Sequence, residues 1–145
     1  MKVVLQRVAG ASVEVAGRKI SSIGPGLLLL VGADGDDTEK TADFVADRCL
    51  GLRIFEDEQG KMNRSIGEID GAILAVSQFT LSADLSKGRR PSFTSAMKPV
   101  EAEKLFDYFV DKLKGSGLTV KTGRFGAKMM VHIDNDGPVT FILEG

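Results

Sequence analysis

The segment from Gly26 to Gly32 constrains the fold of this 145-residue chain more than any other. It reads GLLLLVG, five apolar residues enclosed by two glycines. Such a run is too short for a helix that is stable alone, but it is typical of a strand with both faces in a core. We therefore predict a central strand here, covered by other parts of the chain on both sides.

Short β-type segments recur along most of the rest of the sequence. Gly10 and Gly17 separate the first three, which resemble a meander of hairpins. Strands outnumber helices by about four to one without a regular βαβ alternation, which favours an α+β fold over a doubly wound sheet. The further predicted strands are residues 3–5, 12–15, 19–21, 53–55, 72–81, 118–122, 128–133 and 139–143.

Two segments have the periodicity of amphipathic helices. The first follows Asp36, which with Glu39 resembles a capping box, and its apolar stripe is Ala42, Val45, Cys49 and Leu52. The second begins at Pro99 and stops at Gly115. We predict one β-rich α+β domain over residues 1–145, with two main helices and strands in two packed sheets or a barrel-like sheet.

Composition excludes several classes of site. Lys and Arg total 19 against 20 Asp and Glu, so any contact with RNA must be local. Cys49 is the only cysteine and His132 the only histidine, which excludes an intrachain disulfide and a zinc site of several thiolates or imidazoles. We expect Cys49 in the core, His132 facing solvent or hydrogen-bonded, and no cofactor or metal. Arg7 interrupts any signal-like core and no apolar run reaches the ~18 residues of a membrane span, so we expect a cytoplasmic protein.

The segment Ser77, Gln78, Phe79, Thr80 is the strongest catalytic candidate, because polar groups gather where an apolar strand ends. The simpler interpretation is that these residues only cap the strand. A hydroxyl nucleophile needs a neighbouring base, and the chain offers only one histidine, carboxylates and lysines. If the segment is catalytic, its backbone N–H groups are therefore expected to matter more than its hydroxyls.

A second candidate lies just beyond it. Lys87, Arg89, Arg90 and Phe93 group three cations with an aromatic ring in a predicted loop. That composition suits contact with RNA phosphates and an unstacked base, although such clusters are often only solvated surface.

The third candidate is Gly137-Pro138, which precedes a strongly β-forming run near the chain end. Proline brings no N–H to a sheet, so the pair either forms a turn between two strands or holds backbone that a ligand must meet. The residues alone leave both interpretations open.

Five motifs in order along the chain resemble the D-aminoacyl-tRNA deacylases of the bacterial type. No motif is specific alone, but their order and spacing are, and the likeness runs from end to end. They are Gln6-Arg7-Val8, Ser77-Gln78-Phe79-Thr80-Leu81, Arg90-Pro91-Ser92-Phe93, Thr122-Gly123-Arg124-Phe125 and Asn135-Asp136-Gly137-Pro138-Val139-Thr140.

The resemblance implies a homodimer whose two active sites bind the 3′ adenosine of a tRNA that carries an esterified D-amino acid. Gly137-Pro138 would have a cis peptide bond, held by Arg7, and would reach into the partner's pocket to exclude L-amino acids. Glycine would pass this filter, so glycine mischarged onto the tRNA for alanine is a second expected substrate. The backbone N–H groups of Phe79 and Thr80 would form the oxyanion hole, and Ser77 and Gln78 would shape the pocket.

Catalysis would then use the 2′-hydroxyl of the tRNA itself. Two rival hypotheses remain open at this stage. In one, Thr80 is a covalent nucleophile of the same hydrolase. In the other, the protein is a non-catalytic RNA-binding module built on Arg89 and Arg90.

Overall fold

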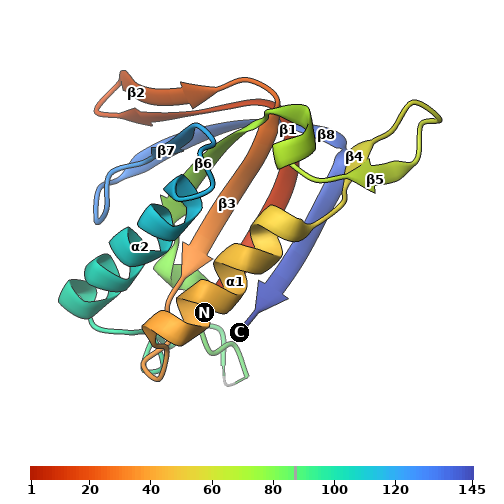
Figure 1. The fold of residues 1–145 in the computed structure, drawn as a ribbon. Helices are drawn as coiled ribbons and strands as arrows, with labels where there is room; N and C mark the ends of the chain where they lie inside the picture. The colour runs from red at the N-terminus through yellow and green to blue at the C-terminus, as the bar shows by residue number, and fades with distance from the viewer. Residues whose placement is uncertain (87) are drawn as a thin grey trace.

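The computed structural model describes residues 1–86 and 88–145 and contains a nearly closed, barrel-like sheet with two helices against it (Figure 1). The sheet has six strands in the order β2-β1-β3-β6-β7, and β8 pairs with β1. A small second sheet holds β4 and β5. The strands are β1 Lys2–Val15, β2 Arg18–Ile23, β3 Gly26–Gly32, β4 Phe55–Glu56, β5 Met62–Arg64, β6 Ala72–Ser77, β7 Val120–Thr122 and β8 Met129–Glu144. The helices are α1 Glu39–Gly51 and α2 Pro99–Lys114, with short 3-10 turns at Gly67–Ile69 and Phe79–Ser82.

Strand β3 lies inside the molecule, as its apolar sequence predicts. Leu27 and Leu29 belong to the core shared with the two helices, and Leu28 belongs to a second core on the other face of the sheet. All three side chains are at most 1% exposed. β3 runs antiparallel to β1 and parallel to β6, so the strand is enclosed in the sheet as well as by both cores.

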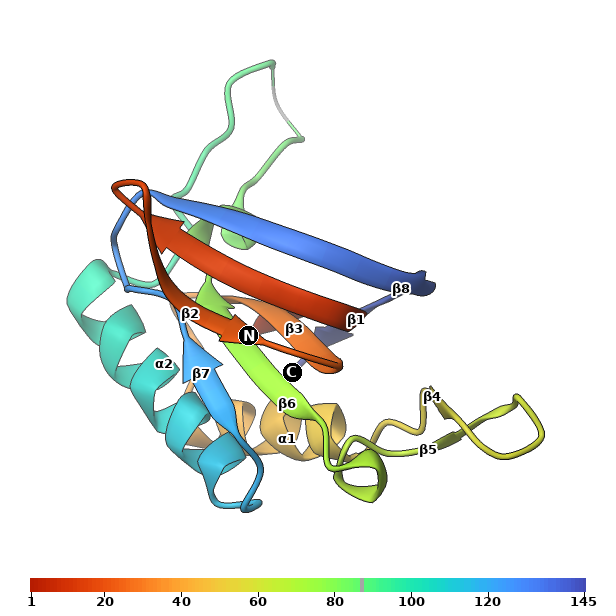
Figure 2. The same ribbon diagram turned by 90° about the horizontal axis from the view of Figure 1, so that it is seen from above.

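The sheet curls until its two ends approach each other. Figure 2 shows β2 close to β7, and the Lys121 Nζ donates a hydrogen bond to the carbonyl of Ser22 at 2.8 Å. The second core, which includes Val13 and Leu74, fills the inside of this curl. The strands therefore adopt the barrel-like form of the predicted architecture.

The outer strands are longer than the sequence predicts. Gly10 does not end β1, and residues 129–144 form one strand, β8, rather than two. β1 and β8 pair from Lys2 opposite Glu144 to Val15 opposite Met129, with irregularities between Gln6 and Gly10. Ladder hydrogen bonds on both sides of these irregularities override the local turn signals.

Helix α1 begins later than its predicted cap. Its N-cap is Thr38, which shares a capping box with Thr41, so the predicted cap at Asp36 with Glu39 is wrong. Ala42, Val45 and Cys49 are buried as expected, and burial raises the pKa of the Cys49 thiol to about 12. The bounds of α2, with Gly115 as its C-cap, are confirmed.

The two helices lie side by side on one face of the sheet (Figure 1). A polar contact at their surface joins them, in which Asp43 accepts a hydrogen bond from the Tyr108 hydroxyl at 3.0 Å and pairs with Lys112 at 3.1 Å. Neither helix, nor any other in the described part of the chain, is long and apolar enough to cross a membrane.

Candidate functional site

The catalytic candidate segment lies where β6 leaves the sheet. The backbone N–H of Gln78 donates to the carbonyl of Val31 at 2.7 Å, and the chain then tightens into a 3-10 turn over Phe79–Ser82. The predicted strand through Leu81 is therefore four residues too long, because its partner β3 ends at Gly32. The turn packs closely over that glycine, where an added Cβ would lie 2.9 Å from the Gln78 carbonyl oxygen.

A cavity of about 460 Å³ opens beside this turn. Ser77, Gln78 and Phe79 line it, whereas Thr80 does not. The opposite walls come from the start of α2 and from residues 125–131, and they are largely apolar. None of the described lining residues has an ionisable side chain. The cavity therefore has largely apolar walls and offers no side-chain acid or base.

The backbone of the turn supplies hydrogen-bond donors instead. In the described part of the chain, the N–H groups of Phe79 and Thr80 donate to no backbone carbonyl, as is usual for the first residues of a helical turn. The Thr80 hydroxyl accepts a hydrogen bond from the Gln78 side-chain amide. His132 lies elsewhere, on β8, where its Nε2 is 3.3 Å from a Glu14 carboxylate oxygen. No imidazole is therefore in place to activate Thr80.

Gly137 and Pro138 project from β8 where its pairing with β1 is interrupted. Gln6 pairs with Thr140 and Val8 with Asn135, so residues 136–139 form a bulge opposite Arg7. The peptide bond between the two residues is cis, as the resemblance implies, and both residues are exposed. Neither residue lines the 460 Å³ cavity of the same chain.

Side chains hold both ends of this bulge. Arg7 is buried, at 5% exposure, and its Nε lies 3.1 Å from the Asp136 carboxylate. The Asn135 side-chain amide donates to the carbonyls of Arg7 at 3.0 Å and Val139 at 3.1 Å. The predicted contact between Arg7 and this segment is thus present, through the residue that precedes Gly137.

Three of the four predicted RNA-binding residues lie on the loop that follows the 3-10 turn at Phe79–Ser82. Arg89 and Arg90 are exposed, Phe93 is 38% exposed, and Lys87 lies outside the described residues. Paired backbone hydrogen bonds between Asp84 and Ser92 close the base of the loop. Hydrogen bonds from the hydroxyl and the backbone N–H of Ser86 lower the pKa of Asp84. The ring of Phe93 packs against Phe79, which brings the two predicted segments together.

The apolar wall of the cavity was not predicted from the sequence. Phe125, Met129 and Val131 form part of it. One signal for this wall is Gly123, because an added Cβ there would lie 2.6 Å from the Met129 sulfur. A second signal is the spacing of Met129 and Val131, which are two residues apart on β8. Because side chains alternate between the two faces of a strand, both lie on the same side.

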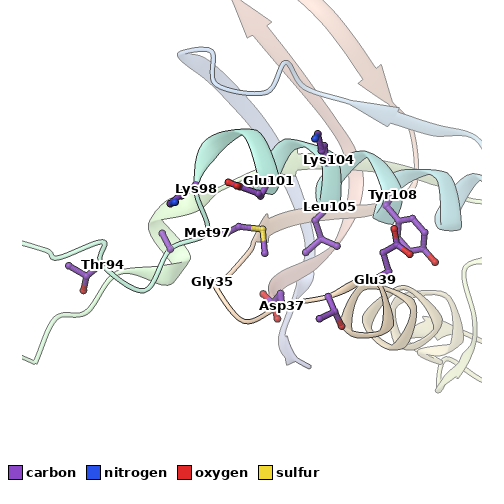
Figure 3. A pocket seen from close by; sticks show the side chains of 12 residues that line it. Gly35, Asp37, Glu39, Thr94, Met97, Lys98, Glu101, Lys104, Leu105 and Tyr108 are labelled. Atoms are coloured by element: carbon purple, nitrogen blue, oxygen red, sulfur yellow. The ribbon is translucent and has the colours of Figure 1, made fainter.

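A second cavity, of about 700 Å³, lies between the starts of α1 and α2 (Figure 3). Asp37, Glu39, Glu101, Lys98 and Lys104 are among its lining residues, and Met97 lines both cavities. Within residues 1–86 and 88–145 there is no cluster of three or more histidine, cysteine or acidic side chains that could hold a metal ion.

Sequence comparison connects this site with a known family. The family model for D-Tyr-tRNA(Tyr) deacylase matches residues 4–144. A D-aminoacyl-tRNA deacylase of Geobacter sulfurreducens is 54% identical over 144 residues, which are 99% of this chain and 95% of the relative. Another, of Brevibacillus brevis, is 56% identical over 144 residues and 99% of both chains.

Two solved structures share the fold. One, described as a c-Myc DNA unwinding element binding protein, has a TM-score of 0.94 and 45% identity over 100% of this chain and 99% of its own. The other, a probable eukaryotic D-amino acid tRNA deacylase, has a TM-score of 0.88 over 99% and 98% of the two chains, with 18% identity. With its family match over residues 4–144 and its identity above 50% to full-length relatives, the chain belongs to the D-Tyr-tRNA(Tyr) deacylase family, whose members are ester hydrolases that act on aminoacyl-tRNA.

Proposed function

We propose that this enzyme of the D-aminoacyl-tRNA deacylase class hydrolyses the ester between a D-amino acid and the 3′ adenosine of tRNA, in the cytoplasm. The observation that carries the proposal is the largely apolar cavity at the end of β6, beside a turn whose first N–H groups donate to no backbone carbonyl of the described chain. An aromatic and aliphatic surface such as Phe125 with Met129 suits a purine ring, and the donors beside Gln78 suit a reacting ester.

In the proposed mechanism, water attacks the ester carbonyl and the N–H groups of Phe79 and Thr80 bind the oxyanion that forms. Each such donor contributes about 3 kcal/mol to transition-state stabilisation in other hydrolases. The intermediate then collapses, the bond to the ribose 3′ oxygen breaks, and the amino acid leaves as a carboxylate. Ser77 and Gln78 shape the pocket around the ester.

The proton acceptor in this mechanism is the neighbouring 2′-hydroxyl of the ribose, which orients the water and relays its proton to the leaving 3′ oxygen. The lack of an ionisable side chain among the described lining residues supports an arrangement in which the substrate supplies this group.

Stereochemical selection in this proposal comes from backbone rather than side chains. The carbonyls around Gly137 and Pro138 would meet the α-amino group and leave no room for a side chain of L configuration. Glycine has no side chain to exclude, so glycyl-tRNA for alanine would also be hydrolysed. The exposure of the bulge, its anchorage by Arg7, and its absence from the cavity of its own chain all support a role in a second chain's cavity.

That role requires a homodimer. β8 pairs only with β1 among the described strands, and its Met130 and Ile142 side chains are 62% and 70% exposed. Apolar side chains on a free edge strand are a surface that a second copy would cover. Arg89, Arg90 and Phe93 would contact the tRNA beside each site.

The mechanism is tested by comparing the 2′-deoxy form of the terminal adenosine with the Thr80→Ala variant. We expect hydrolysis of D-tyrosyl-tRNA to fall by 100-fold or more, roughly, without the 2′-hydroxyl, and to persist in Thr80→Ala. Trapping of an acyl-enzyme by mass spectrometry, with loss of activity in Thr80→Ala, would instead establish Thr80 as a nucleophile. Tight tRNA binding without any hydrolysis would indicate an RNA-binding module.

A further inference from the structure

Phe79 and Phe93 form an aromatic pair on the surface that the fold itself does not bury. Their ring centroids are 5.1 Å apart with an interplanar angle of 58°, and their side chains are 60% and 38% exposed. Two large apolar rings left in water are unfavourable for a monomer, so such a pair indicates a binding surface. We propose that it is a stacking platform for the base of the tRNA nucleotide that precedes the terminal adenosine. This inference rests on the proposed function.

The position of the pair supports this assignment. Phe79 lines the 460 Å³ cavity that would receive the terminal adenosine, whereas Phe93 does not line it. The pair therefore extends from the cavity wall onto the outer surface. A nucleotide joined to the bound adenosine must lie directly outside the cavity, and an unpaired base there has a free π-face to stack.

Phe93 is held in place before any ligand arrives. The Asp84 N–H donates to the Ser92 carbonyl at 2.8 Å, and the reverse bond measures 3.1 Å. On the other side, the Phe93 carbonyl accepts a hydrogen bond from the Ala96 N–H at 3.1 Å. A platform fixed by backbone hydrogen bonds loses little conformational entropy when a base stacks on it.

Charge favours one of the two routes by which the RNA chain joined to the adenosine could leave the 460 Å³ cavity. One passes Met97 into the 700 Å³ cavity, whose lining includes Glu39 and Glu101, Lys98 and Lys104, and Asp37, which pairs with the Met1 amine (Figure 3). The other passes Phe93 towards Arg89 and Arg90, which are exposed and form no ion pair with any residue of the described chain. A polyanionic RNA chain is favoured over the two arginines, whereas the lining of the second cavity has charges of both signs.

The test compares two substrates that differ only in the nucleotides beyond the adenosine, namely D-tyrosyl-tRNA and D-tyrosyl-adenosine. In Phe93→Ala, the ratio of kcat/KM on the tRNA to kcat/KM on the adenosine ester should fall roughly 5- to 150-fold, the range for loss of one stacked base. Phe93→Trp should keep the wild-type ratio and Phe93→Leu should not, because leucine has no π-face. Phe44→Ala is the matched control, since Phe44 is 53% exposed but lines neither cavity.

A tRNA that lacks only the base of the penultimate nucleotide completes a double-mutant cycle. One change removes the Phe93 ring, and the other removes the base that would stack on it. The kcat/KM of the wild type should fall as much on this abasic tRNA as the kcat/KM of Phe93→Ala falls on intact tRNA. For Phe93→Ala, removal of the base should cause no further fall. Two results would overturn the inference. One is an equal fall in kcat/KM of Phe93→Ala on D-tyrosyl-tRNA and D-tyrosyl-adenosine, and the other is an additive effect of Phe93→Ala and the missing base on the abasic tRNA. If the wild type hydrolyses neither substrate, the proposed function itself has failed, and that result is distinguishable from either of these.

Discussion

Arg7 connects three parts of the chain through one buried side chain. It lies on β1, its Nη1 donates to the Ile54 carbonyl at 2.7 Å, and its Nε reaches Asp136. Counted over the whole residue, it is the one charged residue of the described chain that is buried. The planar guanidinium makes both contacts at once, which a single ammonium group does not.

We therefore expect Arg7→Lys to lower both stability and activity. Loss of the buried hydrogen bond to Ile54 should reduce the free energy of unfolding by about 1–3 kcal/mol. Release of the bulge at residues 136–139 should lower kcat/KM on D-tyrosyl-tRNA. Arg53→Lys is the matched control, because Arg53 donates to the Asn63 carbonyl at an exposed position. Denaturant unfolding and deacylation assays measure the two effects, and an Arg7→Lys enzyme with wild-type values would refute this role.

Gly137 is required by its backbone conformation as well as by space. Its φ is +121°, and an added Cβ would lie 2.8 Å from the Val139 Cγ2 and 3.2 Å from the Arg7 Nη2. We expect Gly137→Ala to be destabilised by about 1–3 kcal/mol and to lose most of its deacylase activity. At Gly24 an added Cβ meets nothing within 4 Å, so Gly24→Ala should change neither quantity. Similar behaviour of the two variants in unfolding and turnover would contradict this account of residues 136–139.

At the scale of elements, the contact between α1 and α2 should make stability depend on pH in acid. The hydrogen bond from Lys112, assisted by one from Tyr108, lowers the pKa of Asp43 below its ordinary value of 3.8. The folded pKa is thus below the unfolded one, so this contribution to stability is present above pH 3.8 and is lost as the pH falls through the folded value.

Asp43→Asn should accordingly have a lower free energy of unfolding than the wild type at neutral pH, and this difference should disappear in acid. The effect should be small, because both partners are partly exposed and salt screens such pairs. Asp111→Asn is the control, since Asp111 pairs with Lys114 within α2 and joins no second element. Thermal unfolding at a series of pH values measures both. A difference that persists unchanged below the folded pKa would rule out the ion pair as its source.

Element types were predictable from the sequence, but their limits often were not. β3 and α2 carry strong local signals, an apolar run between glycines and a proline start with a glycine stop, and both were predicted correctly. β1 and β8 extend through Gly10 and Gly137 because they pair with each other on both sides of the bulge, a long-range effect that local propensity does not contain. β6 stops at Ser77 because its neighbour ends, which again depends on tertiary structure.

At the scale of the whole molecule, the candidate site was only partly predictable. The segment Ser77–Thr80 was identified from the two hydroxyls and the amide at a strand end, and its first three residues line the cavity. The apolar wall was missed, because Phe125 and Met129 resemble ordinary core residues until the sheet curls and brings them opposite β6. Apolar residues mark a pocket only through their arrangement in space, which a single sequence does not give.

The proposed exchange of Gly137 and Pro138 between subunits can be tested by mixing two inactive variants. One carries Gly137→Ala and an intact cavity, and the other carries Gln78→Ala and an intact bulge. In a twofold dimer formed from an equal mixture, half the dimers are mixed and each has one intact site, so about a quarter of wild-type activity should return. No recovery, with mixed dimers demonstrated by native mass spectrometry, would mean that each bulge serves its own chain.

The central claim is that backbone around Gly137 and Pro138 admits one configuration of amino acid and excludes its mirror image. The most direct measurement is the deacylation rate of D-tyrosyl-tRNA and L-tyrosyl-tRNA, prepared on the same tRNA and assayed with the same enzyme. We expect rapid hydrolysis of the D ester and no hydrolysis of the L ester above the rate without enzyme. Comparable rates on the two esters would contradict the central claim.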